Sequence, residues 1–197
     1  MKKFFMIAAL MVATLSANAQ NEVGQLTLQP KVGVNFANMT GDGDQKMKVG
    51  LLAGVEAEYG ISNNFGLAFG AVYSMEGYKV ERELWGNGVL IGKTKVNANL
   101  DYINIPILAQ FYPVKGLAIK AGVQPAFNVR HKATGDAEYT IEHVNSFNFS
   151  IPVGLSYEYE GFVLDARYNI GITKLYKDAD QGRNSTFSIS LGYKIPF

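Results

Sequence analysis

Apolar and polar residues alternate along most of the chain from residue 28 onwards, and a period of two residues predicts β-strands with two different faces. In the last such segment, Phe187, Ile189 and Leu191 share one face. Ser188 and Ser190 share the opposite face. The segments that show the pattern are residues 28–36, 48–59, 65–74, 102–112, 117–128, 147–159, 162–171 and 186–197. Each is long enough to cross a bilayer when tilted, so we expect eight membrane-crossing strands.

The connections between these segments alternate in length. Short turns are expected at residues 60–64, 113–116 and 160–161. Long polar loops, rich in Gly, Asn, Asp and Lys, are expected at residues 38–47, 79–98, 131–145 and 173–184. Outer-membrane barrels have short turns in the periplasm and long loops outside, and an even number of strands places both termini in the periplasm.

Charge distribution argues for a membrane barrel rather than a soluble β-sandwich, which would also alternate. The apolar face is nearly free of charge in all eight segments. The leading charged residues of the polar face are Lys31, Glu56, Glu58, Lys120, Glu158, Asp165, Arg167 and Lys194. Lys48, Glu76 and Arg130 are assigned to the same face. An eight-stranded barrel is filled by its own side chains, so we interpret the eight leading residues as a structural network of paired charges in the lumen. A proton or ion path is the alternative.

Aromatic residues gather near the ends of the segments, as in the girdles at the two lipid–water interfaces of outer-membrane barrels. The girdle expected at the periplasmic edge contains Tyr59, Phe65, Phe111, Tyr112, Tyr157, Tyr159, Phe162, Tyr193 and Phe197. The outer girdle is expected to contain Phe36, Tyr73, Tyr102, Phe127, Phe147 and Phe187. Phe197 also ends the last amphipathic strand, as is common in barrel precursors. The expected fold is all-β, an eight-stranded antiparallel up-and-down transmembrane β-barrel.

The N-terminal segment predicts export. Lys2 and Lys3 precede an apolar run over residues 4–15, and Ala17 and Ala19 give the small-x-small pattern of a cleavage site. We expect residues 1–19 to be a signal peptide cleaved after Ala19, and residues 20–197 to form one outer-membrane barrel domain. The chain has 18 basic and 17 acidic residues, so loss of two lysines leaves 16 against 17 and no basic excess for nucleic acid. There is no cysteine, and no later apolar run is long enough for a transmembrane helix.

Few residues of the sequence suggest a catalytic or metal-binding site. His143, Ser146 and Glu142 include the residue types of a lipid-modifying enzyme, but no nucleophile motif surrounds the serine. His131 and His143 lack further metal ligands at a diagnostic spacing, and residues 41–44 resemble a calcium loop without its closing glutamate. We therefore assign no catalytic residue, metal or cofactor.

The only tryptophan, Trp85, lies in an apolar stretch of the second long loop. An exposed apolar loop tip is a candidate contact for a partner. Folding of Trp85 onto the barrel rim is the alternative.

Several stretches resemble the PorT-like outer-membrane β-barrel family of Bacteroidetes. They are Asp-Tyr-Ile-Asn-Ile-Pro-Ile at 101–107 with Phe-Tyr-Pro at 111–113, Asp-Ala-Arg-Tyr-Asn-Ile-Gly-Ile-Thr at 165–173, and Leu-Gly-Tyr-Lys at 191–194. The Ala-x-Ala-Gln sequence at the cleavage site fits the same lineage. The resemblance covers nearly the whole mature chain and implies a location and a fold. Some members of this family are tied to protein secretion and gliding, but the motifs carry no functional residue.

The sequence thus predicts a non-enzymatic barrel that presents surface loops and has a structural or interaction role in the cell envelope. The alternatives are a subunit of an envelope secretion or motility machine and an outer-leaflet lipid-modifying enzyme. Expected partners are outer-membrane lipid, the barrel assembly machinery during biogenesis, and a surface or periplasmic protein.

Overall fold

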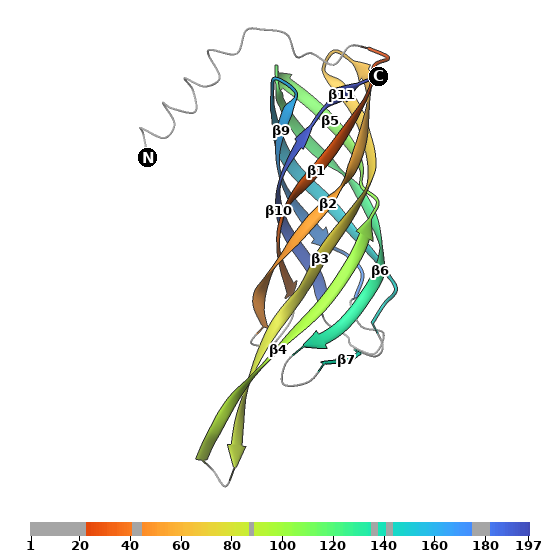
Figure 1. Cartoon of the computed structure of the whole chain (residues 1–197). Coiled ribbons are helices and arrows are strands. Elements are labelled where there is room, and N and C mark those ends of the chain that lie inside the picture. Colours follow the sequence, from red (N-terminus) through yellow and green to blue (C-terminus); the bar gives the residue numbers. More distant parts are fainter. Residues whose placement is uncertain (1–22, 41–44, 87–88, 135–137, 141–143, 175–181) are drawn as a thin grey trace, which may run out of the picture.

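The computed structural model describes residues 23–40, 45–86, 89–134, 138–140, 144–174 and 182–197, with side chains left out at 39–40, 45, 80–86, 89–95 and 138–140. The described residues form one antiparallel sheet that closes on itself into an elongated barrel (Figure 1). Its strands are β1 (Leu26–Thr40), β2 (Gln45–Ser62), β3 (Phe65–Gly86), β4 (Val89–Asn104), β5 (Ile107–Val114), β6 (Leu117–Thr134), β7 (Glu138–Thr140), β8 (Phe147–Tyr159), β9 (Phe162–Gly171), β10 (Arg183–Tyr193) and β11 (Ile195–Pro196). No helix in these ranges has the length and apolar character needed to cross a membrane.

Eight strands cross the barrel, because some of the labelled pieces are consecutive parts of one strand. β4 and β5 both pair with β3 and with β6, and they are separated only at Ile105 and Pro106. Proline has no N–H for the ladder, but the Ile105 N–H still donates to Pro125 O at 2.8 Å. β10 and β11 both pair with β1, which closes the barrel. The three-residue β7 pairs only with β6 among the described residues. The predicted eight-stranded antiparallel barrel is therefore confirmed.

The two faces of the sheet differ as the alternation predicts. Val32 and Leu191 lie directly opposite each other on β1 and β10, and they are 62% and 51% exposed. Ser188 and Ser190, on the other face of β10, are buried inside the barrel. Large exposed apolar side chains recur on every long strand of the barrel. An outer surface of this kind would be costly in water and fits contact with lipid.

Tight turns join the strands at the end of the barrel where the chain terminates. Glu160 and Gly161 connect β8 to β9 with φ values of 48° and 81°. Two positive φ values in a two-residue turn are typical of type I′ hairpins, whose twist matches that of the flanking strands. The turn predicted at 160–161 is confirmed. The turn after β2 is shorter than predicted, at residues 63–64, and the turn after β5 lies at residues 115–116.

The largest correction concerns the second long loop, predicted over residues 79–98. β3 continues to Gly86 and β4 begins at Val89, so most of this segment is a β-hairpin that extends far beyond the rest of the barrel (Figure 1). β6 likewise runs on to Thr134 inside the expected loop 131–145. The polar composition suggested loops, but a two-stranded ladder needs only backbone hydrogen bonds and not an apolar face.

Two tyrosines expected in the aromatic girdles lie inside the barrel instead. Tyr102 is 1% exposed and packs with Leu100 and Ala126, and Tyr112 is 8% exposed. Both occupy inward positions in the alternation of their strand. The girdle prediction was wrong for them because it counted aromatic rings near strand ends without regard to the face.

Candidate functional site

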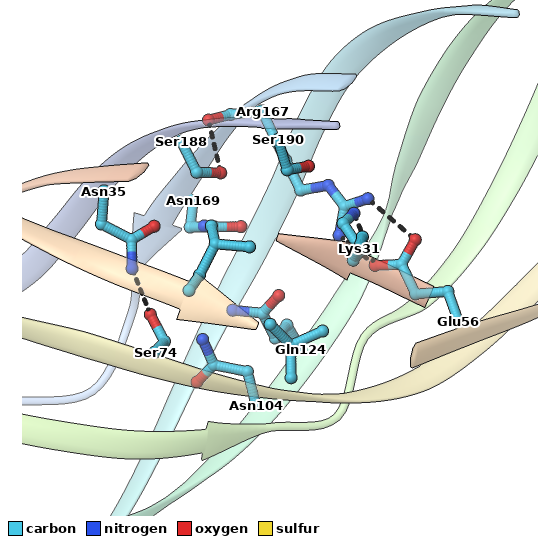
Figure 2. Close-up of a pocket in the computed structure, with 12 residues that line it drawn as sticks. Lys31, Asn35, Glu56, Ser74, Asn104, Gln124, Arg167, Asn169, Ser188 and Ser190 are labelled. Atoms are coloured by element: carbon cyan, nitrogen blue, oxygen red, sulfur yellow. Dashed lines mark hydrogen bonds and ion pairs between the residues drawn. The ribbon is translucent and has the colours of Figure 1, made fainter. Parts of the chain in front are cut away.

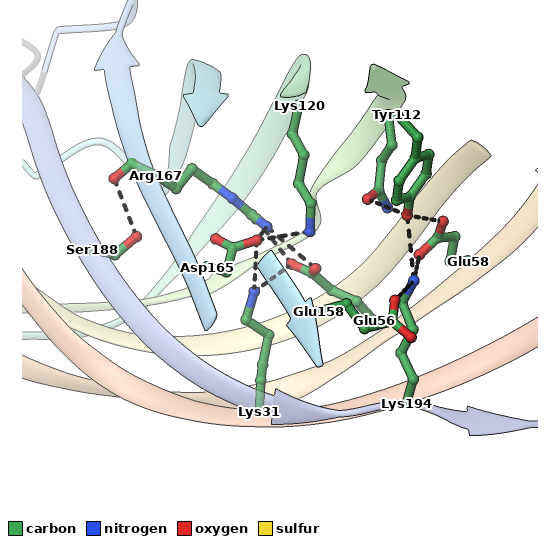
Figure 3. Close-up of polar contacts among 11 residues, drawn as sticks. Lys31, Glu56, Glu58, Tyr112, Lys120, Glu158, Asp165, Arg167, Ser188 and Lys194 are labelled. Carbon is green, nitrogen blue, oxygen red and sulfur yellow. Dashed lines mark hydrogen bonds and ion pairs between the residues drawn. The ribbon is translucent and has the colours of Figure 1, made fainter. Parts of the chain in front are cut away.

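The lumen holds a dense group of paired charges at mid-barrel, which we call the central cluster: Lys31, Glu56, Lys120, Asp165 and Arg167 (Figure 3). These residues come from β1, β2, β6 and β9, which are strands from both halves of the chain. Asp165 and Arg167 are two residues apart on β9, and a strand places such residues on the same face. Every member is at most 5% exposed.

Arg167 is the hub of the central cluster. Its Nη1 and Nη2 donate to the two carboxylate oxygens of Glu56 at 2.9 and 3.2 Å, and Nη2 also donates to Asp165 Oδ2 at 3.0 Å. Lys31 Nζ donates to Glu56 Oε1 at 3.2 Å, and Lys120 Nζ donates to Asp165 Oδ2 at 2.8 Å. Two-pronged contact between a guanidinium and a carboxylate is the strongest common form of charged hydrogen bonding in proteins. The cluster therefore ties four strands together across the lumen.

A second group, the turn-side cluster, lies nearer the end with the tight turns and consists of Glu58, Tyr112, Glu158 and Lys194 (Figure 3). Lys194 Nζ lies 2.9 Å from Glu58 Oε2 and 2.8 Å from Glu158 Oε2. The Tyr112 hydroxyl donates to Glu58, which explains why this ring turns inward. Lys194 sits between β10 and β11, so its side chain links the last crossing strand to β2 and β8.

A third group, the loop-side cluster, surrounds the buried carboxylate of Glu76. Ser74 Oγ and Asn104 Nδ2 donate to Glu76 Oε1 at 2.6 and 3.1 Å. Asn184 Nδ2 and Thr186 Oγ1 donate to Glu76 Oε2. The alternation of the sequence predicts Glu76 on the polar face. It does not single out the neutral donors around Glu76, because buried Asn, Ser and Thr residues look like any other inward polar residue.

All eight residues predicted for the lumen network lie inside the barrel, and Glu158 is the most exposed of them. They divide between the central and turn-side clusters, and together they supply four cations and four carboxylates. Arg130 was expected in the lumen, but it does not lie there. Its side chain is 46% exposed, and its Nη1 lies 3.7 Å from Oδ2 of Asp101, a residue that is not among the predicted site residues. Asp101 also accepts a hydrogen bond from the Tyr73 hydroxyl at 2.7 Å.

A small polar cavity lies in the lumen between the central and loop-side clusters (Figure 2). Its lining residues are Lys31, Asn35, Leu52, Glu56, Val72, Ser74, Asn104, Gln124, Arg167, Asn169, Ser188 and Ser190. All but Leu52 and Val72 are polar or charged. Polar walls and narrow space make this part of the lumen a place for small hydrogen-bonding guests rather than for apolar ligands.

The remaining candidates lie in or near the long connections. Ser146 is exposed, and exposed His131 contacts the Asn128 side chain through Nδ1 at 2.9 Å. His143, Glu142 and residues 41–44 lie outside the described residues, as does the segment 1–19. Trp85 lies at the end of β3 opposite Leu90, and its side chain is outside the described part. The described residues contain no cluster of three or more His, Cys, Asp or Glu side chains that could hold a metal ion.

A closed sheet with a lipid-compatible outside and a charged inside defines a transmembrane β-barrel. The chain matches the family described as "Outer membrane protein beta-barrel domain" over residues 18–177, and it belongs to that family. It is accordingly a bacterial outer-membrane protein.

Two solved structures share the fold at low sequence identity. The attachment invasion locus protein Ail of Yersinia pestis has a TM-score of 0.54 at 15% identity, with 88% of this chain and 100% of Ail covered. Neisserial surface protein A has a TM-score of 0.54 at 16% identity, with 86% of this chain and 97% of that protein covered. No curated protein matches the sequence. The likeness to these two structures supports the eight-stranded outer-membrane barrel.

Proposed function

We propose that this protein is a non-enzymatic outer-membrane anchor that presents an extended β-hairpin at the cell surface for contact with a surface or envelope protein. The observation that carries the proposal is the hairpin of β3 and β4. Among the described residues, β3 pairs with β2 only up to Val80, and β4 pairs with β6 only from Asn97 onwards. Within the described part of the chain, residues 81–86 and 89–96 therefore pair only with each other, and both outer edges of this ladder are open.

An open strand edge carries unpaired N–H and C=O groups, and extended segments of other proteins can add to it. The hairpin also carries Trp85, which we propose as a contact for the partner. Within the described residues the lumen holds a compact polar network and one small cavity, so the protruding hairpin is the feature best suited to interaction. The central cluster is then a structural support that keeps the platform rigid.

The more specific predictions about the family group, the signal peptide and the partners are part of the same proposal. The stretches at 101–107, 111–113, 165–173 and 191–194 support membership of the PorT-like group of Bacteroidetes. Residues 1–19 have the pattern of a signal peptide cleaved after Ala19, and residues 20–197 would then form the mature domain. We propose outer-membrane lipid and the barrel assembly machinery as partners during biogenesis, since every protein of this class has to insert into that membrane.

Surface labelling tests the placement of the hairpin. The chain has no cysteine, so single cysteines can be introduced by Trp85→Cys in the hairpin and Glu160→Cys in the turn between β8 and β9. On intact cells a membrane-impermeant thiol reagent should label residue 85 and leave residue 160 unlabelled. After the envelope is opened both should react. Labelling of residue 160 alone on intact cells would contradict the proposal.

Hairpin removal tests the interaction. Residues 82–94 are replaced by Asn-Gly, and a matched variant shortens the connection around β7 by the residues 135–141. A strain that lacks the protein is complemented with each variant, and its surface contacts are recorded by cross-linking. The proposal expects specific cross-links to disappear only with the shortened hairpin. Full retention of all cross-links by a correctly inserted barrel without the hairpin would overturn it.

A further inference from the structure

The lumen cavity has room for one small guest. Its free volume is about 20 Å³, and about 10–15 Å³ suffices for a guest of the size of a water molecule. Apolar cavities of this size stay empty, but this one is lined mainly by polar and charged side chains from both ends of the chain. The chemistry of the walls therefore decides which guest is bound.

The wall offers one buried hydrogen-bond donor without a partner. Both terminal nitrogens of Arg167 are used by Glu56 and Asp165, but its Nε–H has no partner among the described residues. The Arg167 side chain is 5% exposed, and Arg167 lines the cavity. A charged donor that stays unpaired inside a protein costs more free energy than a neutral one, so a guest that accepts this hydrogen bond would be stabilised.

The charged residues around the cavity also favour a negatively charged guest. The central cluster has three cations, Lys31, Lys120 and Arg167, against two carboxylates, Glu56 and Asp165. The opposite excess belongs to the turn-side cluster, and none of its members lines the cavity. Of the residues that line the cavity, Lys31 and Arg167 are cations and Glu56 is the one carboxylate, so the wall itself carries a net positive charge. The nearby Glu76 carboxylate accepts hydrogen bonds from Ser74 and Asn104 of this wall and from two further neutral donors.

The amide side chains of Asn35, Asn104 and Gln124 line the same space (Figure 2). Their nitrogens already donate to Ser74, Glu76 and Ser150, which leaves the Nε–H of Arg167 as the unpaired donor of the wall among the described residues.

We propose that this cavity binds one small monovalent anion, a halide such as chloride, through the Nε–H of Arg167. The Asn169 side chain lines the same cavity, and its Oδ1 is buried without a partner. The oxygen and nitrogen of an asparagine amide exchange places by a simple flip. With an anion bound, Asn169 turns its Nδ2 toward the guest, whereas a water molecule as the guest leaves Oδ1 facing the cavity.

The first test uses the full mature protein, refolded without halide in a zwitterionic detergent. Unfolding by urea is followed in sodium chloride, sodium bromide and sodium gluconate at equal ionic strength. A ligand that binds only the folded state raises stability in proportion to the logarithm of its concentration above the dissociation constant. Chloride and bromide should raise the unfolding midpoint in this way, and gluconate, which is too large for the cavity, should not. Equal midpoints in all three salts overturn the proposal.

Two serines provide a matched pair of variants that separates the cavity from general salt effects. Ser190 on β10 and Ser156 on β8 both lie directly opposite Asp165, and both are buried. Only Ser190 lines the cavity. Ser190→Val fills the space and should abolish the halide response, whereas Ser156→Val should keep it. The same response in both variants overturns the proposal.

Crystals of the unaltered protein grown in bromide supply a measurement that does not depend on any variant. An anomalous peak within hydrogen-bond distance of Arg167 Nε, with Asn169 Nδ2 facing it, is the expected result. Bromide that is found at the outer surface and not in the cavity is an adventitious ion only, and this result overturns the proposal. A water molecule at Arg167 Nε with Asn169 Oδ1 facing it overturns it too.

Discussion

Arg167 shows how a full positive charge is kept inside a membrane-spanning barrel. Its guanidinium is buried, and desolvation alone would cost several kcal/mol, as for any ion moved into a protein interior. Glu56 accepts two parallel hydrogen bonds from the guanidinium, and Asp165, on the same strand as Arg167, accepts another. Each carboxylate also has a lysine partner. The consequence is that each member of the central cluster is stable only while the others are present.

Charge balance inside the central cluster predicts an order of stability among three variants. Asp165→Asn leaves three cations against one carboxylate and removes the only carboxylate that is bonded to Lys120 among the described residues. Arg167→Met leaves two cations against two carboxylates. Removing one partner of a buried ion pair costs about 3–5 kcal/mol. We expect Asp165→Asn to destabilise more than Arg167→Met when unfolding by denaturant is measured in lipid vesicles.

Ser188→Ala is the control for this series. Ser188 Oγ donates to the backbone oxygen of Arg167 at 3.4 Å, and loss of one neutral hydrogen bond costs about 1 kcal/mol. Ser188→Ala should therefore lie between the unaltered protein and both charge variants. An Arg167→Met protein as stable as Ser188→Ala would show that the central cluster contributes no net stability.

At the scale of the strand, β10 shows the two environments on either side of the sheet. Leu191 is exposed on the outside and lies opposite Val32 and Leu164, which are also apolar and exposed. Ile195, on β11, continues the same outward face toward the end of the chain. The depth of the two residues in a bilayer differs, because Leu191 is farther from the terminal edge of the barrel.

This difference in depth predicts different costs for the same substitution. An arginine on the lipid face costs about 2–4 kcal/mol at the bilayer midplane and about 0–1 kcal/mol near the interface. Leu191→Arg should therefore lower the free energy of folding into vesicles more than Ile195→Arg does. Equal costs for the two variants would contradict the assignment of this strand to lipid, because a soluble barrel has no gradient of depth.

The amount of structure that the sequence predicted also differs between elements. Alternation predicted which face of each strand is inside, because the period of two is a property of the backbone. It does not predict how far a ladder continues, so the sequence predicts a loop where the structure has the β3–β4 hairpin. The partners of the lumen charges were equally hidden: Arg167 and Glu56 meet through the closure of the barrel, and nothing local in the sequence aligns residues more than a hundred positions apart.

For the whole molecule, closure of the sheet predicts resistance to detergent. β1 pairs with β10 and β11, so all the strands that cross the barrel are bonded on both sides within the described residues. Separation of any strand has to break two ladders and the lumen clusters together. An unboiled sample in dodecyl sulfate should migrate in a gel differently from a boiled one, with circular dichroism dominated by strand. Identical migration and a helical spectrum would contradict the fold.

The filled lumen predicts a low conductance. The central and turn-side clusters cross the interior between strands on opposite sides of the barrel (Figure 3). The cavity on the loop side of the central cluster holds about one small guest (Figure 2). The purified protein should give little or no steady current in planar bilayers. Large and stable current steps from a monomer would show that the clusters separate readily and would favour an ion path through the lumen.

The alternation of lipid-facing and lumen-facing residues has a consequence for transit of the chain through the cell. A protein bound for the outer membrane first passes through the inner membrane, where a continuous apolar segment of about 20 residues would be retained as a helix. In β10, Ser188 follows Phe187 and Ser190 follows Ile189, so no such segment arises. The residues that fill the lumen at the destination thus keep the unfolded chain from stopping in the wrong membrane on the way.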